Sequence, residues 1–367
     1  MPGPPKPNHS RRVWLIAVST VIVAMVLVLV WIRHFTSPAF IENLFASAMG
    51  PNYRVHVGSS SFDPLSRRFV AHDISIQPDT LSLQVREGEL RTRYSLMVST
   101  LRASGVDLWG LSRERIVFAS VEIDTPRVEI YLDRTVPDST EVAPSTLPHV
   151  LLLGLERPLR IDTIRIVGGD LLYVERADDG ERAGTFQFAD LNANISHVTN
   201  DTTRMGTPCS IEVRSRLANA GQLDAVFEYD FRSKALAMNY RGTVGKIGAL
   251  SLNELLVDLE GFRITAGVID TTSFAFEVKD DVASGTLRVL YHDIAYEVID
   301  KNSLEQGLKE HFGSMLYKSK SHASNPEDDE DPPTEITIRR VREPHVSLIK
   351  FVWETIREGL LRTLGVQ

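Results

Sequence analysis

Apolar and polar residues alternate along most of the chain after residue 52. The stretch ASVEIDTPRVEIYLD, residues 119–133, shows the pattern, with Val121 and Ile123 in its first half and Val128 and Ile130 in its second. A β-strand turns successive side chains to opposite faces. The alternation therefore predicts extended chain with one apolar face and one polar face.

The phase of the alternation changes within this stretch. Val121 and Ile123 have odd numbers, whereas Val128 and Ile130 have even numbers, and Pro126 lies between the two sets. A strand that kept a regular ladder through this point would turn half of its apolar residues to the wrong face. The sequence therefore predicts a bulge or a break at Pro126.

At least ten stretches between residues 52 and 300 have the alternation of a strand, and almost none has the spacing of a helix. Parallel crossover units need helical segments between their strands, so we expect an antiparallel sheet. Besides the stretch above, the clearest predicted strands are residues 69–77, 80–85, 160–175, 227–231, 236–244, 262–270, 272–280 and 285–298.

The longest apolar run is residues 13–32, which contain no charged residue. Twenty residues at about 1.5 Å each cover roughly 30 Å of hydrocarbon, and Trp14 and Trp31 stand near the ends as interfacial aromatic residues do. A buried core helix and a cleaved signal peptide are the alternatives, but no small-x-small cleavage site follows the run directly. We predict an uncleaved transmembrane helix.

Basic residues set the expected orientation of this helix. Lys6, Arg11 and Arg12 precede the run, whereas Arg33 is the single basic residue within the twenty positions after it. The positive-inside rule then keeps the short N-terminal tail in the cytoplasm. Nearly all of the remaining chain is expected on the opposite side of the membrane.

Two shorter helices are predicted outside the sheet. Ser37 and Pro38 provide an N-cap and a first helical proline, and apolar residues recur at helical spacing from Phe40 until Gly50. Near the C-terminus, an apolar stripe predicts an amphipathic helix that docks on the sheet, on a membrane surface or on a partner. The residues of this stripe are Ile349, Val352, Trp353, Ile356, Leu360 and Leu364.

These elements divide the chain into five expected parts. The segment SHASNPEDDEDPP, which begins at Ser321, is acidic and rich in proline and is expected to be solvated. The parts are a cytoplasmic tail (1–12), a transmembrane anchor (13–32), a β-rich domain (33–320), an acidic disordered linker (321–335), and a short strand with the amphipathic helix (336–367).

Composition and motifs give no enzymatic signal. The net charge of −8 argues against nucleic acid as the main ligand, and the single cysteine, Cys209, cannot form an intramolecular disulfide. GTVGKIG at Gly242 lacks the Ser or Thr that follows the lysine of a phosphate loop, and acidic residues 327–331 lack the spacing of a calcium loop. We therefore predict no enzyme, no catalytic residue, no metal site and no cofactor.

Five segments carry a resemblance to a known family. They are the apolar run; YRVHVGSSSFDPLSRRFVAHDISIQPDT; FASVEIDTPRVEIYLD; LRIDTIRIVGGDLLYVE with FQFADLNANIS; and ITAGVIDTTSFAFEVKDDVASGTLRVLYHDIAYEVID. In this order they resemble the AsmA-like envelope proteins of Gram-negative bacteria. The resemblance implies a single-pass inner-membrane protein with most of its chain in the periplasm. It also implies a long curved sheet with an apolar concave face, as in bridge-like lipid-transfer proteins.

The expected fold is mostly β: an N-terminal transmembrane helix, a long curved antiparallel sheet that forms a groove, and a C-terminal amphipathic helix. The resemblance implies phospholipid transport between membranes, or outer membrane biogenesis and integrity, with phospholipid acyl chains, the inner membrane and other envelope proteins as partners. The same alternation also suits a closed β-sandwich in a non-enzymatic envelope scaffold, or an adhesin-like or ligand-binding ectodomain. The candidate lipid-contacting residues are Val128, Ile130, Ile164, Ile166, Phe262, Ile264, Phe274, Phe276, Val278, Leu287, Val289 and Tyr291.

Overall fold

The structure is a computed structural model. It describes residues 37–49, 52–79, 92–107, 110, 115–136, 147–155, 157–177, 182–201, 206–218, 220–233, 235–260, 262–298, 324–326, 331–344 and 346–364. The predicted transmembrane span, residues 13–32, and the predicted strand at 80–85 lie outside these residues. Within the described ranges, no helix has the length and apolar character needed to cross a membrane.

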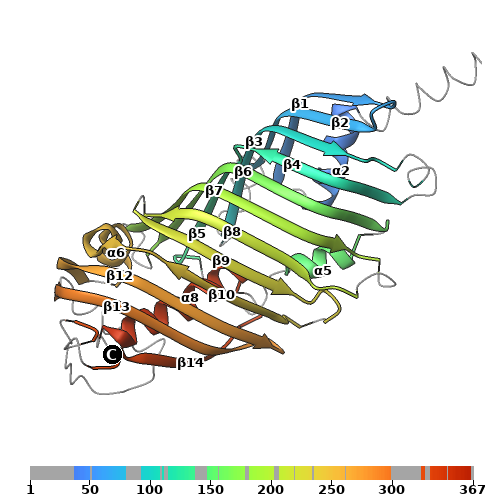
Figure 1. Ribbon diagram of the computed structural model, residues 1–367. Coiled ribbons are helices and arrows are strands. Elements are labelled where there is room, and N and C mark those ends of the chain that lie inside the picture. The colour runs from blue at the N-terminus through green and yellow to red at the C-terminus, as the bar shows by residue number, and fades with distance from the viewer. Residues whose placement is uncertain are drawn as a thin grey trace, which may run out of the picture.

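The described strands form one large curved sheet, which confirms the prediction of a mostly β fold (Figure 1). Adjacent strands lie in the order β1-β2-β3-β4-β6-β7-β8-β9-β10-β12-β13-β14, so most neighbours in the sheet are also neighbours along the chain. In addition, β5 pairs with β3 and β6, and β11 pairs with β12. The strands are β1 (Tyr53–Asp63), β2 (Arg68–Pro78), β3 (Thr92–Ser104), β4 (Ile116–Asp124), β5 (Arg127–Asp133), β6 (Leu159–Arg176), β7 (Ala183–Thr199), β8 (Cys209–Leu217), β9 (Gly221–Tyr229), β10 (Met238–Val244), β11 (Ile247–Gly248), β12 (Phe262–Lys279), β13 (Val282–Val298) and β14 (Glu335–Val341).

The sheet is mixed, so the prediction of a purely antiparallel sheet is wrong. β4 and β5 both run parallel to β6, while the other pairs of described strands are antiparallel. The chain returns from the end of β5 to the start of β6 through a crossover that contains the short helix α5 (Pro148–Leu153). The sequence of this proline-rich crossover does not show the periodicity of a long helix, so it gave no sign of parallel pairing.

The predicted break at Pro126 is confirmed, and it belongs to a seam that crosses several strands. Thr125 separates β4 from β5 and has a φ of 45°, and Asp73 in β2, Gly168 in β6 and Asp190 in β7 also have positive φ angles. The amide of Gly168 donates to Asn192 Oδ1 across β6 and β7, at 3.2 Å. Aspartate and glycine tolerate this left-handed backbone better than most residues. At this seam the alternation of apolar and polar residues in each strand shifts by one position, and the apolar residues keep facing the same side of the sheet.

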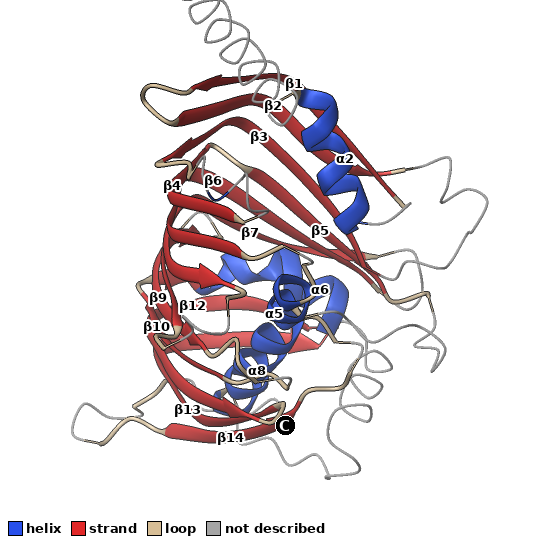
Figure 2. Cartoon of the chain, turned by 90° about the vertical axis from the view of Figure 1, so that its right-hand side faces the viewer, coloured by secondary structure: helices blue, strands red, loops and turns tan. Residues whose placement is uncertain are grey.

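All the described helices of six or more residues lie on the concave side of the sheet (Figure 2). α2 (Pro38–Met49) confirms the predicted helix after Ser37, and α8 (Leu348–Thr363) confirms the C-terminal amphipathic helix. The predicted stripe was wrong at one position, because Ile349 is exposed whereas Phe351, outside the stripe, is fully buried. Sequence reasoning missed α6 (Asn253–Glu260), which follows the 3-10 turn η1 (Ala249–Leu252) and packs on β7 and β12. The Asn253 side chain fixes α6 in place, because it exchanges two 2.8 Å hydrogen bonds with the backbone of Ile264.

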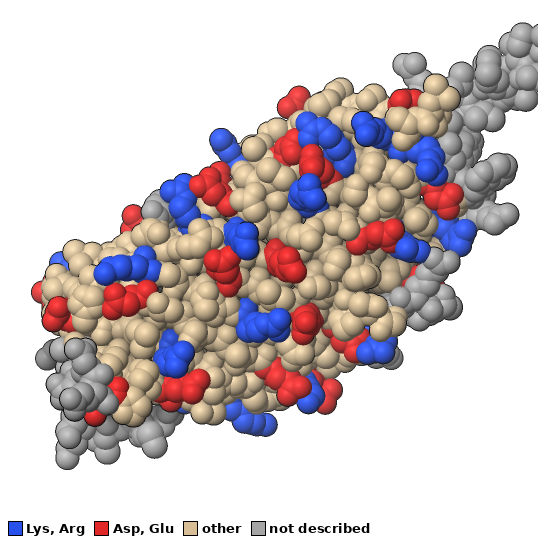
Figure 3. Space-filling view, viewed as in Figure 1, with Lys and Arg blue, Asp and Glu red and all other residues tan. Residues whose placement is uncertain are grey.

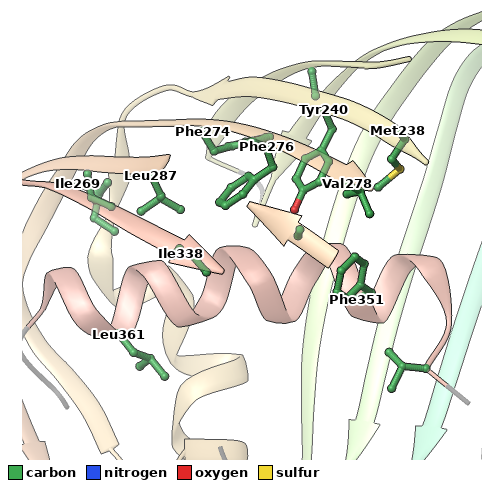
Figure 4. Close-up of a cluster of buried hydrophobic side chains, with 14 of the residues drawn as sticks. Met238, Tyr240, Ile269, Phe274, Phe276, Val278, Leu287, Ile338, Phe351 and Leu361 are labelled. Atoms are coloured by element: carbon green, nitrogen blue, oxygen red, sulfur yellow. The ribbon is translucent and has the colours of Figure 1, made fainter. Parts of the chain in front are cut away.

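The buried core is largest where α8 covers the C-terminal strands (Figure 4). A Cβ atom on Gly359 of α8 would lie 2.6 Å from Ile338 Cδ1 and 3.1 Å from Leu287 Cβ, so helix and sheet are in close contact there. α8 therefore docks on its own sheet, which was one of the three alternatives that the sequence left open. Two smaller clusters lie under α2 and around Phe186 and Trp353.

Among the described residues of the acidic segment, Asn325 is buried, contrary to the expectation that the segment is solvated throughout. Asn325 forms an isolated bridge with Tyr291 of β13. Its Nδ2 donates to the carbonyl of Val289 at 2.6 Å, and its Oδ1 accepts from the amide of Thr334 at 2.8 Å. These bonds fix the chain just before β14 to the sheet.

Candidate functional site

Two rows of mostly apolar residues cross the sheet from one edge to the other. Residues that pair directly across neighbouring strands lie on the same face, so the register shows which side chains form a row. Row one consists of Phe62, Phe69, Ala103, Val121, Ile164, Ile195, Ile211, Phe227, Tyr240, Phe276, Gly285 and Ile338. Row two consists of Ser60, Ala71, Leu101, Ile123, Ile166, Ala193, Val213, Ala225, Gly242, Phe274, Leu287 and Ile336.

Both rows lie on the concave face. Ile338 of row one and Leu287 of row two are the residues that Gly359 of α8 contacts, and α8 lies inside the curve of the sheet. At the other end, Ala71 of row two is buried in the cluster that packs against Ile41 of α2. The apolar face of the sheet is therefore continuous from α2 to α8.

Among the described helices, α2 covers one end of this face and α8 the other, while α6 reaches as far as β7. Under α8, Tyr240, Phe276 and Leu287 are fully or almost fully buried. Between the two covered ends, Val121 of row one and Ala193 of row two are buried, whereas the larger side chains around them are only partly buried. Ile164 and Ile166 belong to none of the described core clusters. We call this region the open apolar surface and define it as Leu101, Ile123, Ile164, Ile166, Ile195 and Ile211.

The opposite face of the same strands is polar. Between rows one and two, the residues that point outward also pair directly, and they include Arg102, Glu122, Arg165, Asn194 and Glu212. Basic and acidic side chains alternate over this convex surface (Figure 3). A shallow hollow of about 300 Å³ on this face has Arg241 and Glu277 in its lining and so does not belong to the open apolar surface.

A buried ion pair lies in the sheet, near the positive charges of α8. Arg134 Nε donates to Glu175 Oε1 at 2.5 Å, and the Tyr173 hydroxyl donates to Glu175 Oε2 at 2.9 Å. Burial opposes ionisation of Glu175, but the positive charges of Arg134, Lys350 and Arg357 outweigh it and lower the pKa of this carboxyl. Glu175 therefore stays ionised and helps to fix α8 in its place on the sheet.

A second polar contact lies under α5. His149 is fully buried, and its Nδ1 lies 2.8 Å from the hydroxyl of Tyr229 on β9. Burial raises the pKa of the Tyr229 hydroxyl, so the phenol remains neutral. This pair has the character of a structural contact, because it positions α5 and neither group is exposed for chemistry.

The sequence-predicted lipid-contacting residues fall into three groups. Val128, Ile164 and Ile166 are partly exposed. Phe262 lies in β12, but its side chain is outside the described set. The other eight are buried in the core: Ile130, Ile264, Phe274, Phe276, Val278, Leu287, Val289 and Tyr291. In this structure α8 and neighbouring segments cover these eight residues, so they do not form part of the open apolar surface.

Sequence reasoning missed four residues of the open apolar surface: Leu101, Ile123, Ile195 and Ile211. Ile123 belongs to the alternating stretch at 119–133, and Ile195 follows the same alternation in FQFADLNANIS. Their facing depends on strand pairing, because only the register places them beside Ile164 and Ile166. Within the described ranges, no group of three or more His, Cys, Asp or Glu side chains has an arrangement suited to a metal ion.

The fold and this surface define a class: a mostly β protein with one large curved sheet, helices on its concave side, and an apolar strip across that side. Comparison of the sequence with known proteins adds no family to this description. The sequence matches no protein-family model, and no curated protein matches it significantly.

Proposed function

We propose that the protein binds phospholipid acyl chains on the open apolar surface and takes part in phospholipid transport between membranes or in outer-membrane integrity. The supporting observation is the pair of mostly apolar rows that cross the strands of the main path and include the partly exposed side chains of the open apolar surface. In this proposal the protein is not an enzyme. It is anchored in the bacterial inner membrane, its β-rich part lies in the periplasm, and it is of the AsmA-like type.

The energy of hydrocarbon hydration gives such a surface a use. A phospholipid with two chains carries about thirty methylenes, and exposing them to water costs about 0.8 kcal/mol each, so on the order of 20 kcal/mol opposes free passage. Apolar side chains that remain in contact with the tails remove much of this cost. Because the surface presents many similar residues and no specific polar partner, it favours movement along the rows over tight binding at one place.

The direction of the rows fits this use. They run perpendicular to the strands, and the strand order places β1, which follows the predicted anchor, at one end and β14 at the other. With neighbouring strands about 4.8 Å apart, eleven spacings give a path of roughly 50 Å. We propose that lipid enters at the end near the inner membrane and moves across the middle strands.

The cover of the concave face distinguishes this proposal from a closed sandwich. A sandwich buries its apolar face against a second sheet, whereas the described strands belong to a single sheet whose apolar face meets helices at its ends. An envelope scaffold without a lipid ligand remains the alternative function. It requires no accessible hydrocarbon-binding residues in the middle of the face.

Site-specific photo-crosslinking in intact cells tests the proposal. A benzophenone amino acid replaces Ile166, which faces the open apolar surface, or Val167, the adjacent residue, whose partly exposed side chain faces outward. We expect mass spectrometry to find phospholipid adducts at position 166 at least fivefold more often than at position 167. Equal labelling of the two positions, or none, would contradict lipid binding on this face.

A charge at the same two positions provides the second test. Ile166→Asp should reduce the phospholipid recovered with the purified full chain, while Val167→Asp should leave it unchanged. Both variants should keep their β-rich circular dichroism, because each side chain is already in partial contact with solvent. If Ile166→Asp retains lipid and Val167→Asp behaves the same, the scaffold alternative is favoured.

A further inference from the structure

The last strand, β14, leaves one hydrogen-bonding edge of the sheet open among the described residues. β14 pairs with β13 on one side and with no other described strand. The amide of Arg342 donates to the carbonyl of Asp281 at the β13 side, at 2.8 Å, so even-numbered residues of this strand direct their backbone groups toward β13. The odd-numbered residues therefore direct their N–H and C=O groups toward the open edge.

The side chains on the odd-numbered positions are exposed. They are Glu335, Thr337, Arg339 and Val341, and they lie on the convex face. The even-numbered Ile336 and Ile338 lie on the concave face, in rows two and one. An exposed edge of this kind is a template for another strand, which proteins usually block with charges, proline or a bulge.

We propose that two copies of the chain associate through antiparallel pairing of their β14 strands, centred on Thr337. In this register, Glu335 of one copy lies opposite Arg339 of the second copy, and the same contact occurs again across the two-fold axis. Thr337 pairs with Thr337 of the second copy. The edge is thus self-complementary in charge, as a two-fold interface requires.

Neighbouring registers are less favourable. A pairing centred on Ile338 places Glu335 opposite Val341 of the second copy, and both charge contacts are lost. A pairing centred on Arg339 places the two copies of Arg339 directly opposite each other, which is repulsive. Other registers would pair odd-numbered residues of one copy with even-numbered residues of the second copy. The backbone groups of the even-numbered residues already point toward β13, so such pairs cannot form hydrogen bonds across the interface.

The centred register also continues the apolar face. It places Ile336 of one copy opposite Ile338 of the second, so row two of one copy meets row one of the other on the concave side. The combined sheet then has twice the twelve strands of the main path, with a β1 strand at each end. This association does not rest on lipid binding, because the edge and its charges are present whatever the concave face holds.

One existing contact must change when the edges pair. The Arg362 side chain of α8 donates to the carbonyl of Thr337 at 3.5 Å, which is the long limit of a hydrogen bond, and it also pairs with Glu358 at 2.7 Å. Thr337 of the second copy would supply a backbone N–H to this carbonyl instead. Arg362 would keep its contact with Glu358.

Disulfide trapping tests the register. Thr337→Cys places a thiol at the two-fold axis, where the Cα atoms of a directly opposed pair are about 5.5 Å apart, within disulfide range. Val341→Cys is the matched control, because it lies on the same face and is exposed but sits four residues from the axis. In membranes that contain the full chain, mild oxidation should cross-link the 337 variant at least fivefold more than the 341 variant.

Charge reversal tests the two salt contacts. In the full chain in detergent, Glu335→Arg or Arg339→Glu alone should weaken the dimer by about tenfold or more in sedimentation, because each introduces two like-charge contacts. The double variant should restore the dimer. Both positions are exposed, so each variant should keep its fold. A monomeric wild-type chain at 100 µM with no cross-link at 337, or equal effects of the single and double reversals, would overturn the proposal.

Discussion

The docking of α8 on the concave face makes a specific prediction about Phe351. This side chain has no exposed surface and packs in the core beneath the C-terminal strands. Replacing a buried phenylalanine by alanine removes its transfer free energy and leaves a cavity, which together cost about 3–5 kcal/mol. Phe351→Ala should therefore lower the free energy of unfolding by about this amount, or release α8 from the sheet.

Ile349 provides the matched control on the same helix. Its side chain is 44% exposed, so Ile349→Ala should change the free energy of unfolding by less than about 0.5 kcal/mol. Urea unfolding of the full chain in detergent gives both values. Trp353 reports on α8 itself, because its ring lies 5.3 Å from that of Phe186 on β7; the other three tryptophans are first replaced by phenylalanine. A cost below about 1 kcal/mol for Phe351→Ala, or a larger cost at Ile349, would refute the docking.

Three further predictions concern stability and reactivity. Glu175→Gln removes the buried carboxylate that Arg134 Nε contacts and should cost about 3 kcal/mol near pH 7. Because folding lowers the pKa of Glu175, its contribution is present above the unfolded pKa near 4.5 and is lost as pH falls through the folded value, so wild type and variant should converge in acid unfolding curves. Gly285→Ala brings a Cβ within 2.7 Å of Phe276 Cα and should lower the urea midpoint by an amount that corresponds to about 2–3 kcal/mol, whereas Gly248→Ala, which meets no atom within 4 Å, should not. Burial raises the pKa of the Cys209 thiol to about 11, so maleimide at pH 8 should label it only after denaturation; rapid labelling of the native chain would contradict its burial.

Local sequence patterns predicted the elements that depend on neighbours in the chain. The alternation at 119–133 predicted strands and the break at Pro126, because the two-residue period of a strand and the restrictions of proline act within a few residues. Ser37 and Pro38 predicted the start of α2 in the same way, and the stripe of Ile356 and Leu360 predicted α8. Each of these signals is complete within one segment.

Other features depend on residues that are far apart in the sequence. The proline-rich stretch between β5 and β6 gave no sign of a parallel crossover, because its short helix α5 is stabilised by contacts such as that of His149 with Tyr229, eighty positions away. α6 was missed for a similar reason, since Asn253 holds it by bonding the backbone of Ile264 in β12. Helices of six to eight residues are marginal without such packing.

The same distinction between local and distant contacts applies to the candidate site. The sequence by itself determined that the chain has many strands with alternating apolar residues, and that no catalytic motif accompanies them. Only the tertiary structure decided that Ile164 and Ile166 lie in open rows while Phe276 and Leu287 lie under α8. Alternation assigns each apolar residue to one face of its own strand, but the register between strands and the place where a distant helix docks determine whether that face meets solvent, ligand or core.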